Sequence, residues 1–166
     1  MPAFSDIFLK RRSIRKFRKA KLSKKFLLQI VRAASLAPTA RNVQPWEFIV
    51  VLDQSRLQEL SKIVSPNGTF LESASGCLII FCRDTRYYLE DGCAATTQAL
   101  LALSMAGWGA CWIAGDKKDY AESVKTFCGI GCGFKLVSLI AIGKSAERPK
   151  PYKRELDKLI HWERFS

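Results

Sequence analysis

The chain has 166 residues, 48% of them apolar, and a formal net charge of +12. A domain of this length buries roughly 70% of its unfolded surface, so it needs no disulfides, and no apolar run approaches the roughly 20 residues of a membrane-spanning helix. The N-terminal residues also lack a signal-peptide pattern, so we expect one domain over residues 1–166, in the cytoplasm and away from membranes.

The first half of the chain alternates helix and strand signals. Ser23 is a suitable N-cap, and the apolar residues after it recur at helical spacing. Pro38 then ends the helix, and a polar loop runs to Pro45. In chain order we expect a helix from Ser5 to about Arg11, a helix from Ser23 to about Leu36, a strand at Trp46–Leu52, a helix at Ser55–Ile63 and a turn at Ser65–Thr69.

The second half supplies the remaining strands and a long apolar helix. In chain order we expect a strand at Cys77–Cys82, a helix at Tyr88–Ala106 followed by the C-cap signal Gly107, a strand at Trp108–Ala114, a helix at Asp119–Phe127 capped by Asp116 or Asp119, a strand at Leu136–Ile142 ended by Gly143, and a tail from Lys144 to Ser166 with a helical turn or two near Leu156–Ile160. Apolar strands separated by helices indicate a sheet covered on both faces.

The helix at Tyr88–Ala106 is apolar nearly all round, so it must be buried on several sides, centrally or at a subunit interface. The tail has too few apolar residues to fold alone and must lie on its own body or on a partner.

The positive charge is concentrated near the start of the chain. Twelve Lys and Arg residues, and no Asp or Glu, lie between Ile7 and Trp46. Such a block attracts polyanions: nucleic acid, an acidic membrane or a phosphorylated cofactor. A solvated basic face is the plainer interpretation, and we adopt it for most of these side chains.

The chain is poorly equipped for hydrolytic or metal chemistry. Its only histidine is His161, and the sequence has no nucleophile elbow, no P-loop and no dinucleotide-binding glycine motif. Cys128 and Cys132 are four residues apart, but no second ligand pair completes a tetrahedral site, so we expect no metal. A cofactor that brings its own reactivity would suit such a chain, and no catalytic side chain is then required.

Three segments combine residue types that suit a flat, phosphorylated ligand. Arg11-Arg12-Ser13-Ile14-Arg15 can clamp an anion, or can be a solvated basic loop. The loop at 37–46, APTARNVQPW, offers small residues and amides that a flat ligand can approach, or is an ordinary connection with Trp46 in the core. The stretch at 107–115, GWGACWIAG, can line a planar pocket or simply end a buried strand.

Together these segments resemble the nitroreductase family. The resemblance rests on RRSIRKF at 11–17, APTARNVQPWEF at 37–48, GWGACWIAG at 107–115 and LIAIGKSAERPKP at 139–151, which follow one another in the family's order over nearly the whole chain. The chain is similar to the short members. The resemblance implies an α+β fold of three layers, with a central mixed, mainly antiparallel sheet flanked by helices. It also implies an intertwined homodimer with FMN at the interface and with the tail at 144–166 packed on the partner subunit.

The resemblance further implies which residues bind FMN. Arg11, Arg12 and Ser13 would contact the phosphate and ribityl region, and Arg15 would lie at the pyrimidine edge, where a cation stabilises negative charge on the ring. The polar loop, which could come from the other subunit, would contribute Thr39, Ala40, Arg41, Asn42 and Gln44. Backbone groups of Ile113, Ala114 and Gly115 would lie near the ring, and either Lys153 or Arg154 of the tail would complete the phosphate site.

By the same resemblance we expect an NAD(P)H-dependent flavin oxidoreductase that reduces nitroaromatics, quinones or related electron-poor small molecules by a ping-pong mechanism. The natural acceptor stays open, because the family also resembles dehalogenases, flavin-fragmenting enzymes and peptide-azoline dehydrogenases. Two alternatives remain: a basic nucleic-acid-binding module built on the Ile7–Trp46 block, and a flavin-binding protein without turnover. The first explains the charge but neither the QPW loop nor the Cys-Trp strand, so we do not expect nucleic acid as the partner.

Overall fold

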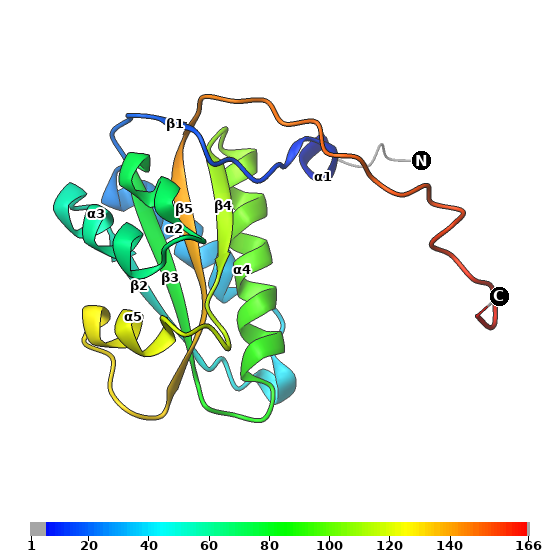
Figure 1. The fold of residues 1–166 in the computed structure, drawn as a ribbon. Coiled ribbons are helices and arrows are strands. Elements are labelled where there is room, and N and C mark those ends of the chain that lie inside the picture. Colours follow the sequence, from blue (N-terminus) through cyan, green and yellow to red (C-terminus); the bar gives the residue numbers. More distant parts are fainter. Residues whose placement is uncertain (1–5, 166) are drawn as a thin grey trace.

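The fold is built on an antiparallel sheet, seen in a computed structural model that describes residues 6–165 (Figure 1). Its strands are β1 (Phe17–Arg18), β2 (Trp46–Val51), β3 (Gly76–Arg83), β4 (Gly109–Ala114) and β5 (Phe134–Ser145). The central strand is β5, which pairs with β3 and β4 along its length and with β1 at its end, while β2 pairs with β3. All these pairings are antiparallel, and the one parallel contact within residues 6–165 is the bridge between Ser13 and Ala110.

Helices cover both faces of the sheet, which gives three layers. The helices and 3-10 turns are α1 (Asp6–Lys10), α2 (Lys24–Ser35), η1 (Ala40–Asn42), α3 (Gln54–Ile63), η2 (Thr69–Ser73), α4 (Tyr88–Met105) and α5 (Ala121–Cys128). One face is covered by α2 and α4, and the other by α3, η2 and α5. The short α1 lies beside α4 (Figure 1). The prediction of a sheet covered on both faces is confirmed.

The two-residue period of β3 divides the core between these faces. Leu78 and Ile80 pack toward α2 and α4, whereas Ile79 and Phe81 pack toward α3 and α5, and all four are fully buried. Fully apolar strands are expected in a sheet covered on both faces, because neither row of side chains reaches water. This burial makes β3 and β5 a fixed frame for the loops at the two ends of the sheet.

The predicted boundaries of α2 and α4 are close to those observed. The Ser23 side chain accepts a hydrogen bond from the amide of Phe26 at 3.2 Å, as an N-cap does at a helix start. Gly107 follows the last turn of α4 with φ +70°, a conformation that suits glycine. Gly92 allows α4 to approach β5 closely, because a Cβ there would lie 2.6 Å from a methyl group of Val137.

Two predicted element ends are wrong. The helix predicted at Asp119–Phe127 is α5 and has Tyr120 as its N-cap residue, so neither Asp116 nor Asp119 caps it. Asp116 instead accepts a hydrogen bond from the Tyr88 hydroxyl at 2.6 Å, and this bond is the main reason that the pKa of Tyr88 rises to about 12. At the other strand end, β5 continues past Gly143, because β1 pairs with the two residues that follow it.

The elements near the two ends of the chain also differ from those predicted from the sequence. The predicted start of the first helix, Ser5, lies outside the described residues, and α1 runs from Asp6 to Lys10. The tail has a hydrogen-bonded turn at 157–159 in place of a helix. In Figure 1 the tail leaves the body after β5 and extends away from it, with Tyr152, Trp162 and Phe165 at least 80% exposed. Within residues 6–165, no helix is both long enough and apolar enough to span a bilayer.

Candidate functional site

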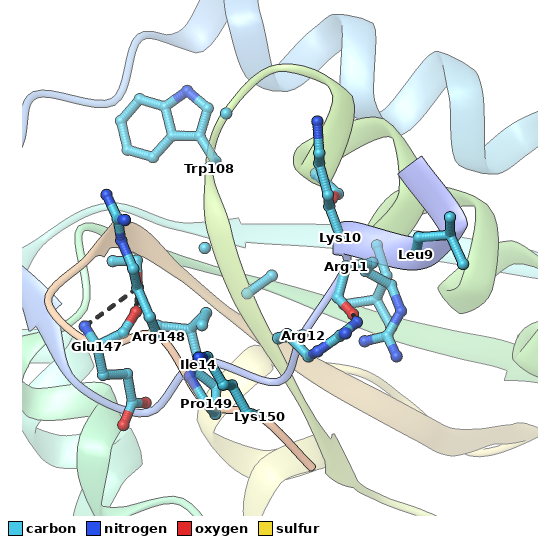
Figure 2. A pocket seen from close by; sticks show the side chains of 16 residues that line it. Leu9, Lys10, Arg11, Arg12, Ile14, Trp108, Glu147, Arg148, Pro149 and Lys150 are labelled. Carbon is cyan, nitrogen blue, oxygen red and sulfur yellow. Dashed lines mark hydrogen bonds between the residues drawn. The ribbon is translucent and has the colours of Figure 1, made fainter. Parts of the chain in front are cut away.

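A cleft of about 430 Å³ lies at the end of the sheet where β4 begins and β5 ends (Figure 2). Three segments line it: residues 9–14 from α1 onward, the last turns of α4 with the start of β4, and residues 145–150 after β5. These segments are far apart in the sequence. The register between β4 and β5, which places Gly109 opposite Gly143, brings two of them together.

The N-terminal wall of the cleft is pinned to the edge of β4. The amide of Ile14 donates to the carbonyl of Ala110 at 2.9 Å, and the Ile14 side chain is buried. A Cβ at Gly109 would lie about 3.1–3.2 Å from the Ile14 side chain and from the Gly143 carbonyl oxygen, so glycine permits the close approach of these chains. Arg11, Arg12 and Ser13 are therefore held beside β4 by backbone contacts.

The cleft carries a strong excess of positive charge. Its walls contain Lys10, Arg11, Arg12, Arg148 and Lys150, and a single carboxylate, that of Glu147. Guanidinium groups bind phosphate by paired, charge-assisted hydrogen bonds, which lysine supplements as a point charge. The cleft thus has the composition of a phosphate site.

The carboxylate of Glu147 does not neutralise this charge. It accepts hydrogen bonds from the amides of Arg15 and Lys16 at 2.5 and 3.0 Å, and these bonds hold the pKa of Glu147 below its usual value. In Figure 2 this carboxylate points away from the guanidinium of Arg148. Glu147 therefore fastens the N-terminal segment to the end of β5, and within residues 6–165 it forms no ion pair with Arg11, Arg12, Arg148 or Lys150.

A flat aromatic surface adjoins the cations. Trp108 stacks on Phe26 with ring centroids 5.6 Å apart, and the ammonium group of Lys144 lies 4.2 Å from the Trp108 ring centroid. Lys144 also donates to the carbonyl of Gly107 at 3.0 Å, which fixes its position over the indole. A planar ligand in this cleft would meet an oriented aromatic ring as well as positive charge.

The structure brings together only some of the residues predicted to form the site. Arg11 and Arg12 line the cleft, and Ser13 lies next to them at the bridge to Ala110. Arg15 is exposed and is not a lining residue; its guanidinium carbon lies 6.0 Å from the ring centroid of Phe70. The prediction for Arg15 therefore depends on how a ligand extends beyond the cleft.

The predicted polar loop lies at the opposite end of the chain's fold. The amide of Ala40 donates to Asp91 in the first turn of α4, whereas Leu100 and Ser104 near the end of α4 line the cleft. Thirteen residues separate Asp91 from Ser104, and at a rise of 1.5 Å per residue they span about 20 Å. In Figure 1 the last turns of α4, which line the cleft, are at the upper end of that helix, and the loop is near its lower end. One chain alone does not bring Thr39–Gln44 to Arg11 and Arg12.

Backbone conformation gives this loop a fixed shape. Arg41, Asn42 and Gln44 have φ values of 53°, 55° and 48°, in the left-handed region that non-glycine residues seldom occupy. The Gln44 amide donates to the Thr39 hydroxyl at 3.2 Å, and the buried Asp91 holds the loop from the side of α4. Such conformations persist where surrounding structure enforces them, and they cluster at functional sites.

The remaining predicted residues are also separated from the cleft. Ile113 and Ala114 lie at the far end of β4 and Gly115 follows it, three to five residues beyond Ala110, which is about 10–16 Å along a strand. In the tail, Lys153 and Arg154 are exposed, and the Arg154 guanidinium donates to the Lys158 carbonyl at 2.9 Å.

The cations that line the cleft from the C-terminal side are Arg148 and Lys150, which sequence reasoning did not select. The signal available was their position in ERPKP, inside one of the four matching motifs. The notable basic pair nearby, Lys153 and Arg154 in PYKR, was assigned to the phosphate site instead.

Comparisons with known proteins agree with this architecture. The model of the family described as "Nitroreductase family" matches residues 8–73. A protein of Archaeoglobus fulgidus, provisionally named an NADH dehydrogenase/NAD(P)H nitroreductase, is 29% identical over 153 residues, which are 87% of this chain and 87% of the relative.

Solved structures extend the similarity to nearly the whole fold. An FMN-dependent nitroreductase from Clostridium difficile R20291 matches with a TM-score of 0.88 and 29% identity, covering 96% of this chain and 98% of the other. A protein from Clostridium acetobutylicum, provisionally named an NADH oxidase, matches with a TM-score of 0.89 and 28% identity, covering 96% and 100%.

Proposed function

Because this chain belongs to the nitroreductase family, we propose that it is an FMN-dependent oxidoreductase that takes hydride from NADH or NADPH and reduces a small electron-poor acceptor. The observation that carries this proposal is the cleft at the start of β4, where Arg11, Arg12, Arg148 and Lys150 surround a space beside Trp108. Nitroaromatics and quinones are the acceptor classes we propose.

The residues of the cleft suit FMN. Five lining cations, with the only lining carboxylate bonded to backbone amides, match a phosphate that carries up to two negative charges. The close backbone approach at Gly109 and the indole of Trp108 suit the ribityl chain and a planar ring. Bound FMN supplies the hydride chemistry, and the protein's part is to bind, orient and exclude competing reactions.

This chain's own residues would act by placement. Arg11 and Arg12, fixed by the Ile14–Ala110 hydrogen bond, would hold the phosphate, and Ser13 would contact the ribityl chain. Between the Ala110 bridge and Ala114, the outer edge of β4 pairs with no other strand within residues 6–165, and its backbone groups at 111–113 would be offered to the ring. Because donor and acceptor would use the same open face in turn, we propose a ping-pong cycle. No general acid from the protein is needed where water can deliver the proton.

We further propose that the active unit is a homodimer. The loop at Thr39–Gln44 lies about 20 Å from the cleft along α4, so a second copy is required if both are to contact one flavin. The tail supports the same assembly, because Tyr152, Trp162 and Phe165 expose at least 80% of their surface in a single chain. Large apolar side chains exposed along one extended segment suit burial against a partner surface, and we propose that the tail crosses to a second copy.

The test is the spectrum of the purified protein. A yellow protein whose flavin absorbance bleaches on anaerobic addition of NADH or NADPH, and returns on addition of a quinone or nitroaromatic, supports the proposal. A yellow protein that neither nucleotide bleaches would be a flavin-binding protein without turnover. A colourless protein that binds DNA with a steep salt dependence would show that the basic residues serve nucleic acid, and the proposal would fall.

A further inference from the structure

A second groove, of about 540 Å³, lies directly beside the cleft. Its walls carry Arg18 from β1, Lys144 from the end of β5 and Arg148 from the segment after it. The groove shares Gly107, Ser145 and residues 147–148 with the cleft, so the two spaces are separated by one stretch of backbone. Arg18 and Lys144 do not line the cleft itself.

The cations of this groove have no acidic partner. Within residues 6–165, no carboxylate forms an ion pair with Arg18, Lys144 or Arg148. Glu147, which also lines the groove, is bonded to the amides of Arg15 and Lys16. Three like charges gathered around one groove repel one another, and an anion bound between them would remove this cost.

Two of the three cations are held in place by the backbone. The Nε of Arg18 donates to the Ser145 carbonyl at 3.1 Å, which fixes its guanidinium group at the end of β5. The ammonium group of Lys144 is fixed between the Gly107 carbonyl and the Trp108 ring. Cations fixed before binding lose less side-chain freedom when an anion arrives, which favours a specific site over a diffuse basic surface.

We infer that this groove binds the 2′-phosphate of NADPH and that the enzyme therefore prefers NADPH to NADH. The inference rests on the proposed function. A phosphate monoester carries about two negative charges and three acceptor oxygens, which the guanidinium group of Arg18 and the ammonium group of Lys144 match in charge, while Arg148 lies on the wall shared with the FMN cleft. A molecule with its phosphate in the groove can extend into the neighbouring cleft across the shared wall. Of the two nicotinamide donors, only NADPH carries a phosphate that is not part of its pyrophosphate bridge.

The experiment compares the holoenzyme with the variant Arg18→Gln, because Arg18 lines the groove but not the cleft. The matched control is Lys21→Gln, which removes the same charge from an exposed position outside the groove. The KM for NADPH and for NADH is measured for each protein at low ionic strength, and binding of adenosine 2′,5′-bisphosphate and of 5′-AMP is measured by calorimetry. We expect the groove variant to raise the KM for NADPH about tenfold, to leave the KM for NADH within twofold, and to weaken only the bisphosphate. The control should change none of these more than twofold.

Three results would overturn the inference. Equal changes in the two KM values, or a bisphosphate affinity that the groove variant leaves intact, would show that the groove does not read the 2′-phosphate. Loss of FMN from the groove variant would assign the groove to the cofactor. If neither nucleotide reduces the wild-type flavin, the proposed function fails on its own, and bisphosphate binding to wild type and variant still decides whether the groove is a phosphate site.

Discussion

Reversing the charge of Arg12 tests the phosphate site at its centre. Arg12 is half-buried in the cleft wall, and its side chain donates to the Arg11 carbonyl at 2.7 Å. A charge-assisted hydrogen bond contributes about 1.5–3 kcal/mol, and a carboxylate placed near the phosphate adds repulsion that the other cations offset only in part. A loss of about 4 kcal/mol, roughly a thousandfold in Kd for FMN, is therefore expected for Arg12→Glu.

The assay is titration of apoprotein with FMN, followed by quenching of flavin fluorescence. Lys25→Glu is the matched control, because it makes the same charge change at an exposed position of α2 and should alter the Kd less than threefold. Thermal unfolding should be nearly unchanged in both variants, since neither side chain lies in the core. An unchanged Kd for Arg12→Glu would remove Arg12 from the phosphate site and would contradict the proposal that the cleft binds the FMN phosphate.

Three further predictions concern the supports of the site. Asp91→Ala should lower the free energy of unfolding by about 1–3 kcal/mol, because the Ala40 amide loses its acceptor, whereas Asp91→Asn keeps an acceptor oxygen and should lose less than half as much; equal urea midpoints for the two variants would contradict this. Gly92→Ala should lower the free energy of unfolding by about 1–2 kcal/mol, because the new methyl group would overpack against Val137. Adding Val137→Ala should restore the urea midpoint, and a midpoint that stays low would show that this contact is not the cause. Deletion of residues 152–166 should convert dimers to monomers in sedimentation, and an unshifted coefficient would show that the tail does not hold the subunits together.

Local chemistry made much of the fold predictable from the sequence. Ser23 marks the start of α2 because its hydroxyl can accept from an amide three residues on, and that signal lies within four residues. The buried strands were evident from unbroken apolar runs, since both faces of the sheet are covered. The cap assigned to Asp116 was wrong because a partner 28 residues away, Tyr88, takes its carboxylate. No pattern within a few residues of Asp116 could reveal that Tyr88 would bind its carboxylate.

The candidate site was less predictable, because long-range register decides which cations share a wall. Arg11 and Arg12 were assigned through the resemblance of RRSIRKF to the nitroreductase family, and the cleft does contain them. Their C-terminal counterparts, Arg148 and Lys150, reach it only because β5 continues past Gly143 to pair with β1, which turns the following residues back over the start of β4. Lys153 and Arg154 follow Arg148 and Lys150 by three to six residues. They look equivalent to that pair in sequence, but they lie on the exposed tail.

The separation of the cleft from the polar loop makes subunit complementation a decisive test of the composite site. Arg12→Glu would remove phosphate binding, and Asn42→Trp would block the ring from the exposed loop at the far end of α4. Each variant alone should lack FMN as a homodimer. In a heterodimer purified through two different tags, one site would combine both changes, while the other would receive an intact cleft from one chain and an intact loop from its partner.

That heterodimer should therefore hold about one FMN per dimer and show about half of the wild-type activity, since one of its two sites is unaltered. If cleft and loop of the same chain formed each site, every site in the heterodimer would carry one lesion, and the heterodimer would be as empty as either parent. The half-restored and empty outcomes differ in flavin content alone, so the test does not depend on knowing the physiological acceptor. An empty heterodimer would refute the shared site even if FMN binding itself were established.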